Sequence, residues 1–533
     1  MGSKKKVRVK RGNVLLMVFI AVLFFVGSLV LVNSSNLYVS PDETANAFFS
    51  NELADHADFL GGYFPAMVGL EDRIHPRSTT IVEFYNLAPG SFLGLPFLYG
   101  VLAMILGGWI LWVLTPLITI GAALAWRKLV EKYTTPLIGT LSFALFLLHP
   151  AVWYYSARGL MHNMLFLDLL ILSAWLWVCR PKRLGVWADV LAGLGLGLSL
   201  FVRASELTWI AGGLLVAALI WHKTLSWRRL RAGLLGLALG IALLLGMNYA
   251  TYGHPLTTGY TALATGQVVD LVAGDSLDAV QLLPFGFHPM TAWKNFSAYG
   301  VGMFWWLSIL AGIGMFLLLS QKRHQRDLRW MIALATAVSV WLVFMYGSWD
   351  IHDNPDPLQI TMANSYVRYW VPMYLMSIPM IAAGIAWVAG FGRTTVAKGF
   401  LAATLCVAVL GLNISAVFVQ GQDGLLKMSS ELQRSGEIQT SVLGHVEQTA
   451  VVIVDRADKL FFPHRRVMYP LRDESTYAAM PVVLKGVPLY YYGITFPQED
   501  MDYLNNSKLA AMGLAIELVE TYDAESLYHI YRP

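Results

Sequence analysis

The sequence is short of two things, cysteine and charge. Only two of its 533 residues are cysteines, Cys179 and Cys406, and both lie in or at the end of apolar runs. This excludes a disulfide framework and a cysteine-rich zinc site. Charged residues make up 14% of the chain, against about a quarter in a typical soluble protein. Because 56% of the residues are hydrophobic, the deficit indicates that much of the chain faces lipid.

Apolar runs long enough to cross a bilayer, which takes about 20 residues, recur through the first 420 positions. A run from Val14 to Val32 follows a basic N-terminal segment, and it is longer than the apolar core of a signal peptide. We therefore expect a retained transmembrane helix there, and a polytopic α-helical membrane protein with eleven spans. The other ten lie near residues 108–126, 136–153, 163–179, 187–203, 207–221, 233–250, 300–320, 330–347, 370–390 and 398–418.

The apolar segment 91–107 is treated differently. If it were a separate span, Arg127, Lys128 and Lys132 would lie outside, against the tendency of short loops to keep their basic residues in the cytoplasm. We therefore predict an interfacial or re-entrant segment there.

Basic residues are distributed very unequally between the two sides of this topology. Six short inner segments hold 22 Lys and Arg residues, whereas the outer segments up to residue 420 hold six. The asymmetry predicts a cytoplasmic N-terminus, with the residues after 420 outside. The long outer segments are 34–90, 251–299 and 348–369, so we expect the working surface on the outer face.

The composition changes after residue 420 to that of a soluble domain. We predict a transmembrane domain over residues 1–420, with a large first outer loop at 34–90, and a small extracytoplasmic α/β domain over 421–533. Strands are expected at 449–455, 482–484, 488–492, 517–519 and 527–531, and a helix at 498–513. The domain carries no glycine-rich phosphate loop, nucleophile motif or metal-ligand spacing.

Adjacent acids, Asp42 and Glu43, open the first outer loop a few residues beyond the first predicted helix. They could form the capped first turn of a surface helix, with Ser40 or Asp42 as the cap. The loop is acid-rich, however, since Asp58 and Glu83 follow among other acids, and it lies close to the membrane. These residues are therefore candidate site residues as well.

Three arginines, Arg158, Arg203 and Arg368, lie singly at the outer ends of predicted helices. Each has aromatic neighbours, which include Tyr154, Tyr155 and Tyr369. A guanidinium can hold phosphate oxygens bidentately. The alternatives are snorkelling toward lipid headgroups, or an internal ion pair such as Arg203 with Glu206.

Two further outer-side residues are candidate supporting residues. Asp168 lies about five residues inside its predicted helix, where it is expected to pair with one of the arginines or to cap a polar pocket. His162 is one of several histidines on that side, and none of them forms a close-spaced metal-binding pair. A divalent metal held by Glu83 and a histidine remains open.

The order of these motifs resembles the GT-C superfamily of glycosyltransferases that use polyprenyl-phosphate-linked sugars. Within it, the likeness is to the protein O-mannosyltransferase group, glycosyltransferase family 39. It covers residues 10–420 and rests on the segments Pro41-Asp42-Glu43, Pro89-Gly90, Tyr154 to Arg158, Phe201 to Glu206, Tyr252 to Tyr260 and Val367 to Pro372. The Trp-Trp-Asp signature of oligosaccharyltransferases is absent, although Ser348-Trp349-Asp350 is superficially similar.

The resemblance implies a mechanism. Asp42 matches the catalytic acid of the family and would be the general base for the acceptor hydroxyl, with Glu43 supporting it or positioning the acceptor. Arg158, Arg203 and Arg368 would neutralise the departing lipid phosphate. The partners implied are the bilayer, the lipid-linked sugar and a protein, lipid or glycan acceptor in the cell envelope, with no nucleic acid.

Two other classes remain open. A transporter or flippase normally has ionisable residues at the bilayer midplane and broken helices in paired repeats. Here only Asp168 lies well inside a predicted span, and the glycine-rich run from Gly193 to Gly197 could break a helix or allow close helix packing. A non-catalytic envelope assembly protein is the second alternative.

Overall fold

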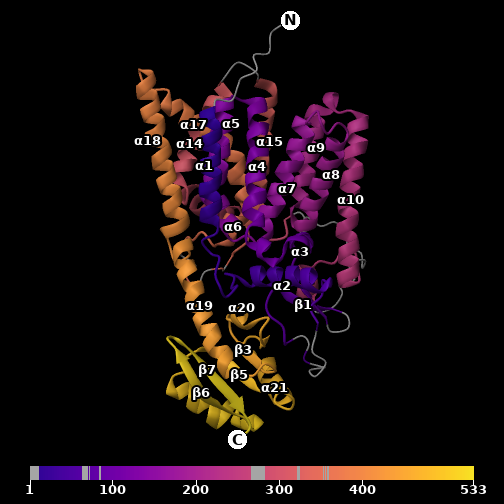
Figure 1. The fold of residues 1–533 in the computed structure, drawn as a ribbon, viewed down its shortest axis with the longest axis vertical. Helices are drawn as coiled ribbons and strands as arrows, with labels where there is room; N and C mark the ends of the chain where they lie inside the picture. Colours follow the sequence, from indigo (N-terminus) through magenta and orange to yellow (C-terminus); the bar gives the residue numbers. More distant parts are fainter. Residues whose placement is uncertain are drawn as a thin grey trace. The chain divides into compact units, whose positions relative to one another are not determined.

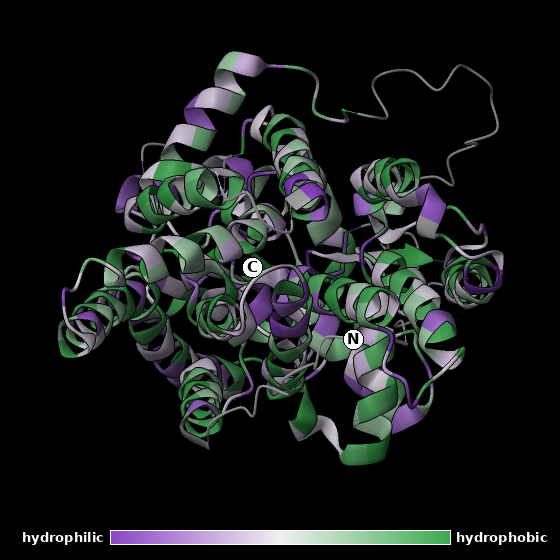
Figure 2. Cartoon of the chain, turned by 90° about the horizontal axis from the view of Figure 1, so that it is seen from above, coloured by the Kyte–Doolittle hydropathy of each residue, from purple (hydrophilic) through white to green (hydrophobic). Residues whose placement is uncertain are grey.

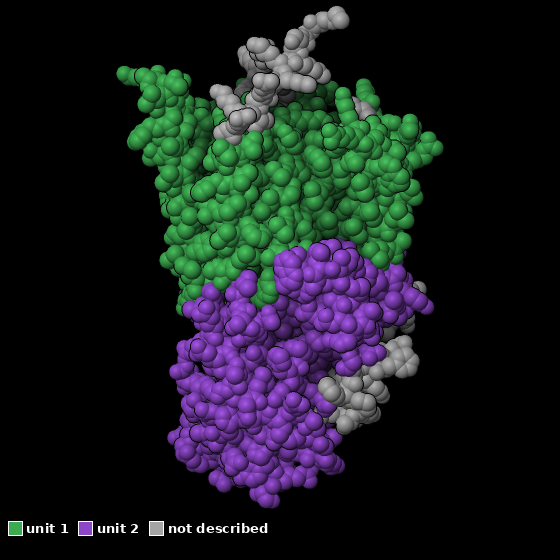
Figure 3. All heavy atoms as spheres, in the orientation of Figure 1, with its two compact units in different colours: residues 1–31, 112–244, 271–427 green, residues 32–111, 245–270, 428–533 purple. Residues whose placement is uncertain are grey.

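The structure of the chain is a computed structural model. It describes residues 11–62, 70, 73–82, 86–265, 283–320, 325–351, 353, 356 and 359–533. The chain divides into two compact units, coloured separately in Figure 3. Unit 1 consists of residues 1–31, 112–244 and 271–427, and unit 2 of residues 32–111, 245–270 and 428–533. The predicted domain boundary at residue 420 stays a prediction.

Unit 1 is helical, and its longer helices are labelled in Figure 1. The elements of the unit are α1 (Arg11–Ser28), α4 (Leu114–Tyr133), α5 (Pro136–Leu148), α6 (Pro150–Ala157), α7 (His162–Cys179), α8 (Trp187–Val202), η4 (Ala204–Glu206), α9 (Leu207–Trp221), η5 (His222–Thr224), α10 (Trp227–Tyr252, whose last turns belong to unit 2), α13 (Pro289–Asn295), η6 (Phe296–Gly302), α14 (Trp305–Ser320), α15 (Gln325–Gly347), α16 (Ser365–Tyr369), α17 (Val371–Ala389), α18 (Thr395–Ile414) and η7 (Ser415–Val419).

Each of the eleven predicted spans coincides with one or more of these helices. Within the described ranges, six helices are long and apolar enough to cross a membrane, or up to eight if each of two bent pairs is one span. Figure 2 shows the corresponding green, hydrophobic turns. The chain is therefore an integral membrane protein, while the count of eleven and the direction of its termini stay predictions.

One of the bends has a local cause. Helices α5 and α6 meet at 47° around His149, whose backbone is extended. Pro150 follows, and a residue before proline is disfavoured in the helical region because the proline ring crowds its backbone. The His149 ring then caps the new helix by accepting a hydrogen bond from the Ala151 amide at 3.3 Å.

The glycine-rich run of α8 allows close helix packing and does not break the helix. α8 runs without interruption from Trp187 to Val202. A methyl group at Gly193 would overlap the Gly233 carbonyl of α10, and one at Gly236 would overlap the Val190 carbonyl of α8. Small residues at such a crossing let two backbones approach each other, which replaces the missing hydrophobic driving force inside a membrane.

One part of unit 2 is built around helices α2 (Pro41–His56) and α3 (Gly94–Leu106), which pack against each other. Strands β1 (Thr79–Val82) and β2 (Asn86–Pro89) form an antiparallel pair, and η3 (Gly108–Trp112) and α11 (Gly259–Thr265) complete it. At 1.5 Å per residue α3 is about 20 Å long. That is shorter than the roughly 30 Å of a bilayer core, and α3 coincides with the segment predicted to be interfacial or re-entrant.

The C-terminal part of the chain holds a five-stranded sheet of order β4-β3-β5-β7-β6. Strands β4, β3 and β5 are parallel, and β7 and β6 are antiparallel to their neighbours. Its elements are α19 (Leu425–His445), β3 (Val451–Val454), α20 (Asp458–Phe461), β4 (Arg466–Met468), α21 (Glu474–Val483), β5 (Leu489–Ile494), α22 (Gln498–Tyr503), η8 (Leu504–Lys508), η9 (Ala510–Met512), β6 (Ala515–Tyr522) and β7 (Glu525–Tyr531).

One predicted strand is wrong. Residues 482 and 483 form the last turn of α21, and Leu484 is the residue that ends it. The helix begins where Asp473 caps it by accepting a hydrogen bond from the Ser475 amide at 2.9 Å. Val483 is buried in the core under the sheet, so the short apolar run belongs to the buried face of a helix. Such a run cannot be distinguished from a buried strand by its pattern alone.

We expect Gly193→Ala to destabilise the protein by about 1–3 kcal/mol, because the added methyl group must push α8 and α10 apart. The midpoint of thermal unfolding in detergent should fall accordingly. Gly212→Ala in α9 is the matched control, since a methyl group there would meet no described atom within 4 Å. Equal stability of the two variants would contradict the close crossing.

Candidate functional site

The predicted site residues fall in both units, so each group is described by itself. Unit 2 contains Asp42, Glu43 and Asp58, and unit 1 contains the three arginines with their aromatic neighbours. Glu83, the remaining acid of the predicted site, lies outside the described residues.

The start of α2 explains why the two adjacent acids differ. Ser40 is extended and caps the helix, and Pro41 occupies the first turn. Glu43 is buried, and its Oε2 accepts hydrogen bonds from the Ser40 amide at 3.0 Å and the Ser40 hydroxyl at 2.8 Å. This capping box satisfies amides that a helix start leaves unpaired. Glu43 therefore holds the helix start, as the structural alternative expected.

Asp42, the next residue along this turn, points its carboxylate to a different partner. It is partly exposed, and its Oδ1 accepts a hydrogen bond of 2.5 Å from the Ser78 hydroxyl. Asp58, by contrast, is exposed, and its Oδ1 accepts from the Leu60 amide two residues on. In the described structure Asp58 thus serves a local turn beyond the end of α2.

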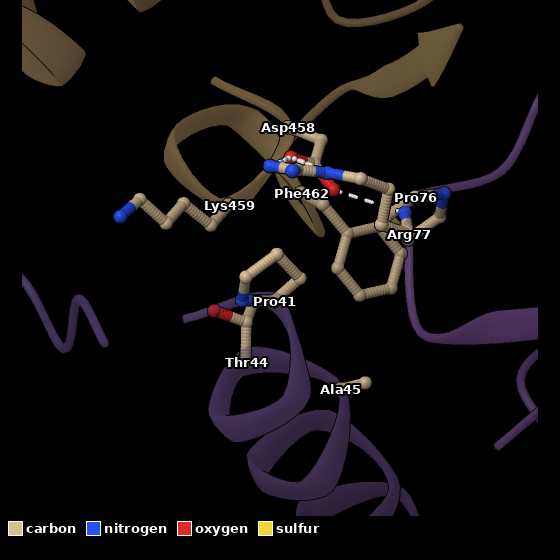
Figure 4. Close-up of a pocket in the computed structure, with 8 residues that line it drawn as sticks. All are labelled: Pro41, Thr44, Ala45, Pro76, Arg77, Asp458, Lys459 and Phe462. Carbon is tan, nitrogen blue, oxygen red and sulfur yellow. Dashed lines mark hydrogen bonds and ion pairs between the residues drawn. The ribbon is translucent and has the colours of Figure 1, made fainter. Parts of the chain in front are cut away.

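The segment that supplies Ser78 is fixed by its neighbour, Arg77. The buried Asp458 carboxylate accepts hydrogen bonds from the Arg77 amide at 2.9 Å, Nε at 3.0 Å and Nη2 at 2.5 Å. Arg77 Nη2 also donates to the Arg456 carbonyl at 2.7 Å. A small pocket beside the start of α2 is lined by Arg77 and Asp458 together with Pro41, Thr44, Ala45, Pro76, Lys459 and Phe462 (Figure 4).

In unit 1, Arg203 lies at the end of α8 and forms a buried ion pair with Glu206, with Nε and Oε1 2.5 Å apart. Glu206 also accepts hydrogen bonds from the Tyr346 hydroxyl and from Trp209 Nε1, both at 2.5 Å. The ion pair that the sequence offered as an alternative for Arg203 is therefore present. A buried carboxylate needs such donors because it has lost its water.

Tyr369 brings two of the predicted arginines together. The guanidinium carbons of Arg203 and Arg368 lie 4.8 Å and 4.9 Å from the centre of its ring, which is within cation–π range. The ring also stacks on Tyr346, with centroids 4.5 Å apart, and is nearly parallel to Trp349. Arg368 Nη2 donates to the Tyr369 hydroxyl at 3.1 Å. We call Arg203, Glu206, Tyr346, Arg368 and Tyr369 the arginine–tyrosine cluster.

The third arginine, Arg158, ends α6 and is buried over the Tyr154 ring at 5.9 Å. Tyr154 packs edge-on against Tyr155, whose hydroxyl donates to the Met362 carbonyl at 2.9 Å. Arg368 Nη1 donates to the sulfur of Met161, three residues after Arg158, at 3.9 Å. Tyr155 therefore links Arg158 to the segment before Arg368, and the structure brings all three arginines into one region of unit 1.

Asp168 does not pair with an arginine in the described structure. It is fully buried in α7, and its Oδ2 accepts a hydrogen bond from the Thr119 hydroxyl of α4 at 2.6 Å. His162 is buried at the first position of α7. Among the described residues, no group of three His, Cys, Asp or Glu side chains is arranged to hold a metal ion.

Five residues of these sites were not predicted from the sequence, and most of them lie in no recognisable motif. Ser78, Arg77 and Asp458 lie in a loop and a domain that had shown no motif, and 381 positions separate the ion-paired residues. Tyr346 was not singled out, and Trp349 was noted only within Ser348-Trp349-Asp350, the segment superficially similar to the oligosaccharyltransferase signature. The sequence holds many possible pairs between arginines of residues 34–90 and acids of the C-terminal domain, and it gives no signal that selects this one.

Comparison with known proteins found likeness in fold alone. No protein-family model and no curated protein sequence matches the chain. The archaeal oligosaccharyltransferase AglB from Archaeoglobus fulgidus, solved with an inhibitory peptide and a dolichol-phosphate, aligns over 94% of this chain and 71% of its own, with a TM-score of 0.53 and 10% identity. The Archaeoglobus fulgidus enzyme tethered to an acceptor peptide aligns over 94% and 70%, with a TM-score of 0.49 and 9% identity.

The chain is therefore similar in fold to AglB, and this likeness supports the GT-C fold that the sequence resemblance implied. The likeness to the O-mannosyltransferase group is not tested by it and stays a prediction.

Removing Glu206 should be costly because it leaves Arg203 buried without its carboxylate. We expect Glu206→Ala to destabilise the protein by about 3 kcal/mol or more. The control is Glu474→Ala, which removes the exposed partner of Lys508 and should cost less than about 1 kcal/mol. Thermal unfolding in detergent measures both, and a Glu206→Ala protein as stable as the control would contradict the buried pair.

Proposed function

We propose that the protein is an integral membrane glycosyltransferase. It moves a hexosyl or pentosyl group from a polyprenyl-phosphate-linked donor to an acceptor hydroxyl on the extracytoplasmic face. The observation that carries the proposal is the fold shared with AglB, whose solved structure contains a dolichol-phosphate. The arginine–tyrosine cluster supports it, because guanidinium groups suit lipid phosphate.

The donor phosphate is bound by the arginines of unit 1. Arg203 is neutralised by Glu206, so its main effect is to hold Tyr369 in place from one side of the cluster. Arg368, on the same ring, and Arg158, above Tyr154, supply positive charge for the phosphate. Such preorganised charge stabilises the negative charge that develops on the leaving group. The aromatic rings flank the sugar or the first prenyl units.

Asp42 acts on the acceptor as general base. The acceptor oxygen attacks the anomeric carbon while the bond from that carbon to the phosphate oxygen breaks, with inversion of configuration. The acceptor proton passes to Asp42, and polyprenyl phosphate leaves with the bonding electron pair. Ser78 supports this role because its hydroxyl orients the Asp42 carboxylate. Glu43 supports it indirectly, through the capping box that fixes the turn.

The side of the membrane follows from charge. The 22 basic residues of the inner segments, against six outside, favour a cytoplasmic N-terminus and an outer site. The acceptor is a protein Ser or Thr, a lipid-linked glycan or an envelope polymer. A divalent metal held by Glu83 and a histidine is part of the proposal.

We expect Asp42→Asn to lower the transfer rate by about 10²–10⁴-fold, since the amide cannot accept the proton. Membrane vesicles containing the protein and a labelled polyprenyl-phosphate sugar provide the assay. Asp55→Asn is the matched control, because Asp55 is an exposed acid on the same helix, and it should keep wild-type activity.

The same vesicles distinguish the proposed enzyme from its alternatives. A glycosyltransferase forms a covalent product, a flippase moves the labelled lipid across the membrane without forming one, and an assembly protein does neither. Full transfer by Asp42→Asn would show that Asp42 is not the base.

Arg368→Gln should raise the KM for the donor by about 10–100-fold, the value of one or two charge-assisted hydrogen bonds. Arg368→Lys should raise it less, because lysine keeps the charge but loses the planar geometry. Arg183→Gln, at an exposed position on an inner segment, should leave the KM unchanged. An unchanged KM in Arg368→Gln would contradict phosphate binding by this residue.

A further inference from the structure

The hydrophobic core of the C-terminal sheet includes a residue from the first outer loop. Ile74 is buried among Val451, Ile453, Met468 and other residues of the sheet and its helices, and Leu70 packs against the same core. Burying an isoleucine contributes about 1.5–3 kcal/mol. The loop around Ile74 is therefore part of the packed structure of unit 2 in spite of a sequence separation of several hundred residues.

The loop is also held at a particular edge of the sheet. Asp458 follows β3, at the carboxyl ends of the parallel strands, where open α/β sheets usually bind a ligand. Here Asp458 instead binds Arg77 of the same chain. Its carboxylate, whose side chain is 1% exposed, accepts the three hydrogen bonds from Arg77 described above.

The next residue, Ser78, has a strained backbone. Its φ angle is +61°, in the left-handed region, which a residue other than glycine avoids at a cost of about 1 kcal/mol or more. Such a conformation persists only where neighbouring contacts impose it. The Arg77 contacts on one side and the start of β1 on the other hold Ser78 so that its hydroxyl reaches Asp42.

Asp458 is the first residue of the short helix α20, and the neighbouring residues of this segment contact the chain around Asp42. Lys459 donates to the Val39 carbonyl, just before α2, at 2.5 Å. Phe462 packs edge-on against Phe48 of α2, with ring centroids 4.7 Å apart. Figure 4 shows Asp458 beside Arg77, with Phe462 near the first turn of α2 and the Lys459 side chain pointing away from Arg77. α20 thus contacts the segments that carry both Ser78 and Asp42.

We propose that Asp458 is a positioning residue for Asp42, and that the C-terminal sheet domain serves to hold the carboxylate in its working orientation. Asp458 fixes Arg77, Arg77 fixes the backbone of Ser78, and Ser78 orients Asp42. The chemical consequence rests on the proposed glycosyltransferase function, whereas the positioning itself is a property of unit 2.

Two single variants, their double variant and a matched control test the proposal in full-length protein in vesicles. Asp458→Asn removes the charge that Arg77 binds. Ser78→Gly removes the hydroxyl but tolerates the positive φ, so its effect does not come from misfolding. Asp473→Asn is the matched control, because the Arg73–Asp473 pair joins the same loop to the same domain but is about 40% exposed on each side.

The first measurement is the rate of sugar transfer. We expect Asp458→Asn and Ser78→Gly each to lower kcat by about tenfold, because a displaced base loses its geometry, with the donor KM unchanged. The double variant should be no slower than the slower single one, since both changes break the same connection. Asp473→Asn should keep wild-type kcat. Additive losses in the double variant, or a normal kcat in Asp458→Asn, would overturn the proposal.

The second measurement needs no activity. Labelling of Asp42 by a water-soluble carbodiimide and an amine, followed by mass spectrometry, reports how accessible the carboxylate is. We expect faster labelling in Asp458→Asn and Ser78→Gly and wild-type labelling in Asp473→Asn. If the wild type transfers no sugar, the proposed function is wrong and labelling alone decides the positioning. Faster labelling in Ser78→Gly together with wild-type labelling in Asp458→Asn would overturn the proposal that Asp458 positions Asp42.

Discussion

The ion pair between Arg77 and Asp458 is the interaction on which the order of unit 2 depends. A carboxylate that is 1% exposed has lost nearly all its water, and it is stable only when donors replace that water. Arg77 supplies three, one of them from its own backbone. Because that donor is a main-chain amide, the pair fixes the course of the chain as well as a side chain. The strained φ of Ser78 and the hydrogen bond to Asp42 follow from it.

The same physical rule explains which acids of the chain are structural. Glu43 accepts hydrogen bonds from the Ser40 cap, and Glu206 accepts them from Arg203, Tyr346 and Trp209. Asp168 has a hydroxyl on one oxygen, while its other oxygen has no hydrogen-bond partner in the described structure. Asp42 differs from all three because it is partly exposed. Under the proposed function, an acid that remains partly accessible to solvent and is oriented by a hydroxyl suits a base better than a buried acid.

Local sequence patterns predicted most of the helices and strands. They did not predict which side chains pair across long stretches of sequence. Every predicted span coincides with a helix, because apolar length is a local property. The capped start of α2 could be expected from Ser40, Pro41 and the two acids. The strand at residues 482–484 failed because a short apolar run fits either a buried helix face or a strand. The Arg77–Asp458 pair was not predictable, since nothing in either segment encodes a partner 381 positions away.

The three arginines of the predicted phosphate site have different surroundings in the structure. Three arginines at helix ends suggested three equivalent phosphate ligands, but the structure makes them unequal. Arg203 shares a buried ion pair and a tyrosine hydroxyl, so moving it toward a phosphate would leave Glu206 uncompensated, at a cost of several kcal/mol. It therefore stays in place and supports Tyr369 from one side. Arg368 contacts the same ring and is partly exposed, so it can turn toward a ligand while the ring remains fixed. In the proposed glycosyltransferase, this rigid aromatic support, with one fixed and one adaptable cation, gives the phosphate site its geometry before the ligand binds.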